Sequence, residues 1–395
     1  MRRISGIRRN YAWGSKTAIP QLLGFEADSE PFAELWFGDH PSGPSSIQPG
    51  GDLRELIGSQ PAEMLGEDVM ARFGDGLPYL LKVLAATKPL SLQVHPHIEQ
   101  ARRGFEAEES SGIAVDARNR NYRDANHKPE LVYALTKFEA LCGFRAPRRA
   151  AELLNGLDTP LARELGQILK AKPDADGVRE AFTRIIHPDT RATAEEVTAI
   201  VNACAEREAN GSPSPRTDRI VQQLAEHYPG DPGVVTSLLL NPVTLHPGDA
   251  MFVPAGCVHA YLEGTAIEVM AASDNVLRAG LTPKHVDVEE LLSLVDCVAA
   301  PPLRIAPEVF YGATRVYYAP VDDFELSVTD LSQKEEKHPL PGRGPRVVLC
   351  LDGNVELFTA REALRLSRGE AAFVSSSGGP LAVHGQGTIV QADVP

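Results

Sequence analysis

The sequence of 395 residues contains few cysteines, and those it has are scattered. The five are Cys142, Cys204, Cys257, Cys297 and Cys350, an odd number without any Cys-x-x-Cys motif. A disulfide framework or a cysteine-ligated zinc site needs paired, closely spaced cysteines. The pattern therefore indicates free thiols in a reducing compartment.

The chain also lacks long apolar runs and an excess of positive charge. No stretch approaches the ~20 apolar residues that span a bilayer, and the N-terminal MRRISGIRRNYAWGS has no apolar segment typical of a secretory signal. The net charge is -14, whereas a nucleic-acid-binding protein needs a basic surface. We expect a cytoplasmic, monomeric enzyme or binding protein that acts on a small molecule, without nucleic acid or membrane as a partner. A local basic pocket would still accept a small anion.

Short apolar runs bounded by proline or glycine dominate the first part of the chain. They predict strands within residues 77–86, 89–95 and 129–144, and helices near 52–58 and 61–73. Strand character returns at residue 234. The later part contains a helix near 288–295 and candidate strands at 324–328, 346–351 and 388–390.

A helical block interrupts this β-structure. Leu161, Leu165 and Leu169 recur at helical spacing, and Thr193 with Glu196 forms a candidate capping box before a second amphipathic segment. We predict a mainly β fold with a helical insertion, in which two β-barrel units flank an α-helical domain. The predicted segments are 1–147 and 234–300 for the first unit, 148–233 for the helical insertion and 301–395 for the second unit.

One internal similarity supports two related β units. LHPGDAMFV (245–253) and LSRGEAAFV (366–374) align without a gap, and each predicts a turn followed by a strand. The position that matches His259 is Pro380. If His259 has a chemical role, the second unit has lost it.

Four residues stand out as candidate metal ligands. In LSLQVHPH (90–97), Gln93 and His95 fall on the same face of a predicted strand, about 7 Å apart. Glu130 begins a strand after Pro129, and His259 follows PAGCV in the first copy of the internal similarity. Two imidazoles, a carboxylate and an amide oxygen suit a divalent ion such as zinc. A barrel that buries a polar histidine would carry a similar pattern.

Other polar residues allow two interpretations each. Lys82 interrupts an apolar strand, so its stem either extends to solvent or its charge meets an anion inside. Glu268 lies on the polar face of a strand that lines either a barrel or the surface. The pair of His127 and Lys128 is typical of a solvated loop, and Arg278 alone is typical of a surface charge.

Five separate motifs, in order, resemble type I mannose-6-phosphate isomerase. They cover most of residues 1–290, while the helical block and the last 90 residues match weakly. The motifs are NYAWGS (10–15), AELWFGDHPSGPS (33–45), PYLLKVLAATKPLSLQVHP (78–96), NHKPELVYALTKFEALCGFR (126–145) and, within 248–288, GDAMFVPAGCVHAYLEG and IEVMAASDNVLRAGLTPKHVDV. One departure is His97, where family members usually carry an acidic residue.

The resemblance implies a cupin (jelly-roll) scaffold with a second, degenerate cupin. It also implies one zinc ion per chain, held by Gln93, His95, Glu130 and His259. The catalytic arginine of the family corresponds to Arg278.

The implied reaction interconverts mannose 6-phosphate and fructose 6-phosphate through a cis-enediol. Lys128, Glu268 and Asp274 are candidates for the base that moves the proton between C2 and C1. Arg278 stays charged and would stabilise the enediolate or position the substrate. We expect Ser91 and Lys82 to bind the phosphate.

Two alternatives remain open from the sequence. His95, His259 and Glu130 also form the 2-His-1-carboxylate set of an Fe(II) cupin dioxygenase. A non-catalytic cupin that binds a sugar phosphate would keep the same ligands without turnover.

Overall fold

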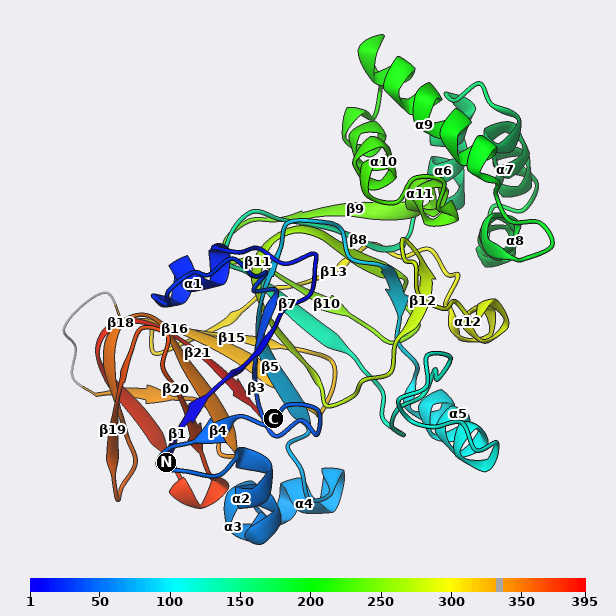
Figure 1. Cartoon of the computed structure of the whole chain (residues 1–395). Helices are drawn as coiled ribbons and strands as arrows, with labels where there is room; N and C mark the ends of the chain where they lie inside the picture. Colours follow the sequence, from blue (N-terminus) through cyan, green and yellow to red (C-terminus); the bar gives the residue numbers. More distant parts are fainter. Residues whose placement is uncertain (332–336) are drawn as a thin grey trace.

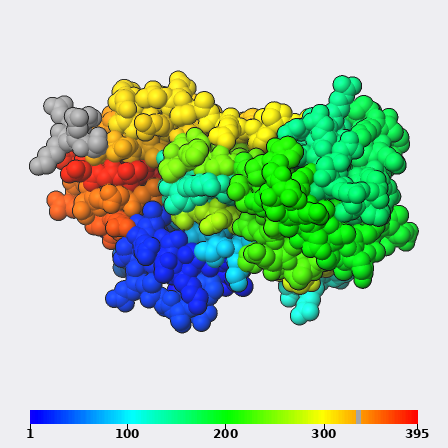
Figure 2. Space-filling view, turned by 90° about the horizontal axis from the view of Figure 1, so that it is seen from above, coloured from blue at the N-terminus to red at the C-terminus, as the bar shows by residue number. Residues whose placement is uncertain are grey.

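Two antiparallel sheets, one of eleven strands and one of ten, form the body of the molecule, and a group of helices projects from one end (Figure 1). This computed structural model describes residues 1–331 and 337–395. In Figure 2 the helices of the insertion (green) and the C-terminal strands (orange and red) lie at opposite ends. The predicted mainly β fold with an interposed helical block is confirmed.

The eleven-stranded sheet forms the first β unit, and it also includes β13, which lies in the segment predicted for the second unit. β11 is its central strand: the second half of β11 pairs with β5 and β7, and its first residues pair with β6 and β8. One strand therefore joins both layers of the unit. The strands are β2 (Ile7–Arg9), β3 (Glu34–Phe37), β5 (Tyr79–Ala86), β6 (Leu92–Val94), β7 (Glu130–Ala134), β8 (Phe138–Phe144), β9 (Leu240–Leu245), β10 (Ala250–Val253), β11 (His259–Ala271), β12 (Leu277–Gly280) and β13 (Leu303–Ile305).

The ten-stranded sheet belongs to the second unit, but it also includes two strands from the start of the chain. β1 pairs with β20, and β4 pairs with β1. The sequence-based boundaries did not anticipate this pairing. The strands are β1 (Arg2–Ser5), β4 (Ser46–Ile47), β14 (Glu308–Phe310), β15 (Thr314–Tyr318), β16 (Glu325–Leu331), β17 (His338–Leu340), β18 (Arg346–Phe358), β19 (Ala363–Ser367), β20 (Ala371–Val374) and β21 (Leu381–Asp393).

β5 shows why the two sheets pack together. All eight of its residues are buried, which explains its nearly continuous apolar sequence. Leu81 and Val83 point into an apolar core that they share with Leu326 and Phe373 of the second sheet. Since side chains alternate along a strand, Lys82 points the other way, into the interior of the first unit.

Six helices fill the insertion between β8 and β9. Thr193 caps α9 with the predicted capping box, in which both reciprocal hydrogen bonds with Glu196 are present. The apolar faces of these helices share a buried cluster with Leu92 of β6 and Leu277 of β12. The insertion thus supports two strands that carry candidate site residues. Its helices are α6 (Pro147–Asn155), α7 (Pro160–Ala171), α8 (Ala175–Ile186), α9 (Ala194–Ala209), α10 (Pro215–His227) and α11 (Pro232–Thr236), followed by the 3-10 turn η1 (Ser237–Leu239).

The remaining helices differ in part from the prediction. Gly66 adopts a positive φ of 87° and splits the helix expected at 61–73 into two. The predicted strand at 89–95 shortens to β6, and His97 is the N-terminal capping residue of α5. These helices are α1 (Ala18–Leu23), α2 (Leu53–Ser59), α3 (Pro61–Leu65), α4 (Glu67–Phe73), α5 (Ile98–Ser110), α12 (Val288–Leu294) and the short η2 (Ser376–Gly378). Among the described residues, no helix combines the length and apolar character required to cross a bilayer.

Candidate metal centre and active site

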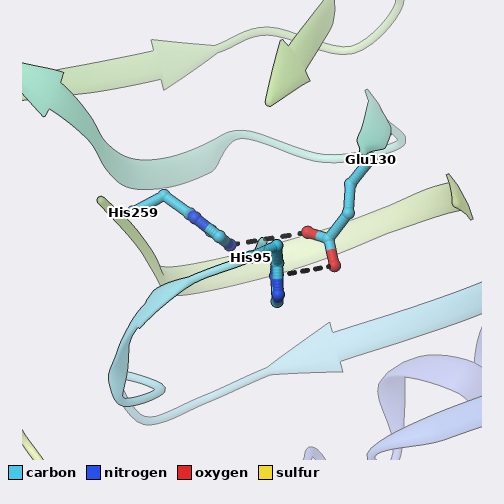
Figure 3. Close-up of side chains that lie close together, drawn as sticks. All are labelled: His95, Glu130 and His259. Atoms are coloured by element: carbon cyan, nitrogen blue, oxygen red, sulfur yellow. Dashed lines mark ion pairs between the residues drawn. The ribbon is translucent and has the colours of Figure 1, made fainter. Parts of the chain in front are cut away.

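Three of the four predicted ligands converge in the interior of the first unit (Figure 3). His95 follows β6, Glu130 begins β7 and His259 begins β11. All three are buried, and one ligand atom from each lies within 4.8 Å of the others. Both imidazoles point toward the Glu130 carboxylate, with Nε2 of His95 3.2 Å from Oε1 and Nε2 of His259 3.5 Å from Oε2.

Backbone carbonyls fix the orientation of both imidazoles. Nδ1 of His95 lies 2.8 Å from the Asn275 carbonyl oxygen, and Nδ1 of His259 lies 3.1 Å from that of Cys257. A carbonyl only accepts, so each Nδ1 carries the proton that it donates. In a neutral imidazole, Nε2 then presents a lone pair, which is the arrangement of a metal-ligating histidine.

The protonation of His95 and Glu130 favours a bound cation at the site. Burial lowers the pKa of His95 to about 4, and the Lys128 ammonium acts in the same direction, so this imidazole is neutral at pH 7. Burial raises the pKa of Glu130, but His95, Lys128 and His259 together outweigh that effect and hold it well below its ordinary range. The lone pair of His95 therefore faces an ionised carboxylate. Nε2 of His95 makes no hydrogen bond to any residue that the structure describes, and a bound cation would satisfy both groups.

The pKa of His259 shifts in the opposite direction to that of His95. Burial lowers the pKa of His259, but the hydrogen bond to Glu130 and its charge raise it by more, so the net shift is upward. Metal binding requires a neutral imidazole, so a cation at this site would favour the deprotonated form of His259. The residues present thus fit a divalent metal ion.

Gln93 lies on the same face as this group. It is directly opposite His259 in the β6–β11 pair and opposite Arg278 in the β6–β12 pair. Its Nε2 donates to the Ser91 hydroxyl at 3.3 Å, which leaves its amide oxygen available as a ligand. The structure therefore brings all four predicted ligands to one location. Ser91, just before β6, contacts Gln93.

A cavity of about 70 Å³ adjoins the ligands, and lysine and glutamate side chains supply most of its polar lining. Lys128 Nζ lies 3.3 Å from Glu130, and Lys82 Nζ lies 2.9 Å from Glu268. The hydroxyl of Tyr261 donates to Glu130 at 3.1 Å. The interior interpretation of Lys82 and Glu268 thus holds, because both are buried and face this cavity.

The Lys82–Glu268 pair is a buried ion pair within a cluster of acids. Burial by itself lowers the pKa of Lys82, but the carboxylates of Glu268, Glu34 and Glu130 raise it by more. Burial raises the pKa of Glu268, and this exceeds the lowering by Lys82. Lys82 therefore remains charged, and Glu268 is a weaker acid than an exposed glutamate.

Arg278 belongs to a group of cations outside this cavity. Burial lowers the pKa of Arg278, and Arg123 lowers it further. Burial, Arg278 and Arg123 likewise lower the pKa of Lys284. None of the three forms an ion pair with an acid among the described residues. A group of cations that repel one another and have no acidic partner is typical of a site that binds an anion.

A larger cleft of about 1340 Å³ opens beside the site, lined in part by Arg123, His127 and Asp274. His40 also lines this cleft, and its Nε2 lies 3.4 Å from Oδ1 of Asp274. Burial, the largest influence, lowers the pKa of His40 to about 4. Sequence reasoning missed His40 and Arg123, although both lie within or beside the motifs.

His127 contacts the second β unit. Its Nε2 lies 2.9 Å and 3.1 Å from the two carboxylate oxygens of Asp323, which is 4% exposed and precedes β16. The expectation of a solvated pair at His127 and Lys128 is therefore wrong, because Asp323 binds the imidazole and Glu130 binds the ammonium.

Comparisons with known proteins agree with this arrangement. A family model described as phosphomannose isomerase type I, catalytic domain, matches residues 1–147. Mannose-6-phosphate isomerase of Escherichia coli K12 is 40% identical over 99% of both chains, and that of Bos taurus is 31% identical over 95% of this chain and 93% of the other.

Solved structures extend the likeness to the fold. A mannose 6-phosphate isomerase bound with zinc and yttrium, and the Salmonella typhimurium enzyme bound to substrate and zinc, each align with a TM-score of 0.89. Each is 38% identical to this chain and covers 99% of it, with 98% of the solved chain matched. Near-complete coverage at this identity, together with the converging ligands, places the chain in the type I mannose-6-phosphate isomerase family.

Proposed function

We propose that the protein is a zinc-dependent aldose–ketose isomerase that interconverts mannose 6-phosphate and fructose 6-phosphate. The observation that carries this proposal is the pair of carbonyl-anchored imidazoles of His95 and His259, which converge on the ionised Glu130 beside a charged cavity. The family relationship supplies the substrate pair.

In this proposal Gln93, His95, Glu130 and His259 hold the zinc ion. When bound, zinc would polarise substrate oxygens and stabilise the negative charge of an enediolate. Zinc with one carboxylate ligand keeps a net positive charge suited to this task. The carbonyls of Asn275 and Cys257 keep both imidazoles oriented for ligation.

Lys128 and Glu268 are the proposed groups for moving the proton between C2 and C1. Both line the 70 Å³ cavity, so both are near the substrate that would occupy it. The raised pKa of Glu268 makes its carboxylate a stronger base, whereas Lys82 keeps that carboxylate in place. Arg278, a permanent cation opposite Gln93, would stabilise developing negative charge.

We propose that two sets of residues share the binding of the substrate phosphate. Ser91 and Lys82 remain the predicted contacts, but the charge of Lys82 is already balanced by Glu268. Positive charge without an acidic partner comes from the group of cations described above, Arg278, Arg123 and Lys284. We propose that Arg123 and Lys284 bind most of the phosphate charge and that Ser91 contributes a hydroxyl donor, while Arg278 is left for the enediolate.

The alternatives have no observation in their favour. The ligand set would also accept Fe(II). A dioxygenase, however, requires neither a fourth, amide ligand nor a group of cations suited to phosphate. A pure binding protein would not need a buried base beside the metal.

A coupled assay for fructose 6-phosphate formed from mannose 6-phosphate tests the proposal. Activity should disappear after chelation and return when zinc is added. A fully zinc-loaded protein without turnover would refute the isomerase function, and oxygen consumption with bound iron would support the dioxygenase instead.

We further propose that the enzyme is a cytoplasmic monomer. The scattered cysteines, all free thiols in the described residues, suit a reducing compartment. Size-exclusion chromatography with light scattering at micromolar concentration should give the mass of one chain, 42.7 kDa. A mass of two chains would contradict the monomer.

A further inference from the structure

Two cysteines lie next to each other beside the metal centre. The sulfur atoms of Cys142 and Cys257 are 3.7 Å apart, although 115 residues separate them in the chain. Cys142 is buried in β8, and Cys257 is half-buried in the turn before β11. Both line a pocket of about 110 Å³, whose wall includes the 60% exposed Val298. A small solute can therefore approach Cys257 from outside.

Each cysteine is also connected to the same proposed ligand. Cys142 lies directly opposite His259 in the β8–β11 pair. The carbonyl oxygen of Cys257 accepts the hydrogen bond from Nδ1 of His259. A change in the position of Cys257 would therefore change the support of His259.

We propose that Cys142 and Cys257 form a reversible disulfide that weakens metal retention at His259. A disulfide needs a sulfur–sulfur distance of about 2.05 Å, so the two sulfurs must approach by less than ~2 Å. The bond would form through rotation of the two side chains and a small shift of the turn that carries Cys257. Within the described residues, no other pair of cysteine sulfurs is in contact.

Hydrogen peroxide, a small two-electron oxidant, completes the chemistry. The thiolate of Cys257 attacks one oxygen, the O–O bond breaks, and a sulfenic acid and hydroxide form. The thiolate of Cys142 then attacks that sulfur and releases a second hydroxide. Both hydroxides take up the protons that left the thiols, so two thiols and one peroxide give one disulfide and two waters.

The effect on the metal rests on the proposed function, in which His259 ligates zinc. The disulfide draws Cys257 toward β8 and displaces the carbonyl that orients Nδ1 of His259. Loss of such a supporting hydrogen bond typically costs a factor of about 10 to 100 in metal affinity. We expect zinc to dissociate about tenfold faster from the oxidised protein.

The test uses the full chain loaded with zinc. The protein is treated with hydrogen peroxide, the peroxide is removed with catalase, and a non-reducing digest is analysed by mass spectrometry. The expected product is a peptide pair joined through Cys142 and Cys257. Zinc release to a chromogenic chelator should then be about tenfold faster, and dithiothreitol should restore the original rate.

Three variants serve as controls. Cys142→Ser and Cys257→Ser should each abolish the peroxide-dependent acceleration, while Cys204→Ala in α9 should keep it. Two separate serine variants guard against a folding defect in either one.

Each contrary outcome has a distinct meaning. The proposal is overturned if peroxide leaves both thiols unlinked, or if the disulfide forms while zinc release is unchanged. If the reduced protein binds no zinc, the proposed function fails instead, and the disulfide mapping still tests the cysteine pair alone.

Discussion

The two β units share a turn followed by a strand, but they differ in the side chains at the positions that hold the candidate metal ligands. In the first, the His246 amide donates to Asp249 in the turn before β10, and in the second the Ser367 amide donates to Glu370 before β20. The glycine in each turn, Gly248 or Gly369, has a positive φ. The internal similarity seen in the sequence is therefore a repeated turn and strand.

The ligand positions show the difference. Val253 of β10 pairs with Glu130, whereas its counterpart in β20, Val374, pairs with Arg346. A cation thus stands where the first unit has its ligand carboxylate. The guanidinium of Arg346 is fully buried and donates to backbone carbonyls. The scaffold alone does not create a metal site, because a few side chains at strand ends decide whether it binds a cation or fills its interior.

Removing a ligand in the first unit should have the largest effect. Glu130→Gln deletes the one negative charge that balances the metal, and we expect zinc to be lost and kcat to fall by about 1,000-fold or more. The counterpart Arg346→Met in the second unit should retain zinc and most of the activity. Elemental analysis and the coupled assay measure both. An active Glu130→Gln protein would contradict the ligand assignment.

Arg278→Ala should lower kcat by about 100-fold while zinc stays bound, since the guanidinium acts on developing charge and is not a ligand. Arg278→Lys should recover part of the loss because it restores a cation. If zinc content falls with kcat, the arginine supports the metal site itself.

Breaking the contact between His127 of the first unit and Asp323 of the second should have a smaller effect on kcat. Asp323→Asn removes the carboxylate that holds His127, and we expect kcat to fall by about tenfold with zinc unchanged. The neighbouring Asp322, 87% exposed, provides a matched control as Asp322→Asn. Equal activity of the two variants would show that the contact between Asp323 and His127 does not contribute to catalysis.

The contributions of Asp393 and His95 to the pH dependence of stability should have opposite signs. Burial raises the pKa of Asp393 in the second unit to about 7, from an ordinary 3.8. The folded state then keeps a proton that the unfolded state loses, so stability from this group falls as pH rises from about 4 to 7. Burial lowers the pKa of His95 to about 4, so stability from His95 rises between pH 4 and 6.5.

Asp393→Asn isolates the first of these effects. In zinc-free protein, the difference in Tm between the variant and the wild type should shift in favour of the variant as pH increases from 4 to 7, and then stay constant. Thermal unfolding at several pH values measures this. A difference independent of pH would show that Asp393 is ionised throughout.

The sequence predicted the ligands because their signals are local. Gln93 and His95 share a strand face, and motifs around Glu130 and His259 resemble a known family. The structure brings these residues together, although their role as ligands stays a proposal. The contact between His127 and Asp323 could not be predicted, because it joins loops 196 residues apart whose approach depends on the packing of two sheets.

Shorter-range differences have other physical causes. The break at Gly66 comes from a backbone conformation that glycine adopts freely, which outweighs the helical spacing around it. β6 ends at Val94, and Pro96 just beyond it lacks the amide proton that would extend the ladder. The membership of β1 in the second sheet depends on a partner more than 360 residues away.

The position of β1 has a consequence for how the chain folds during synthesis. β20 lies between β18 and β1, so before β1 is in place the second unit exposes β20 as an unpaired edge. The ribosome produces β1 before β20, so this pairing has to wait until the more than 360 residues between them have been made. Contacts of such long sequence separation form slowly. The pairing of β1 therefore couples completion of the second sheet to the segment that leads into the first sheet.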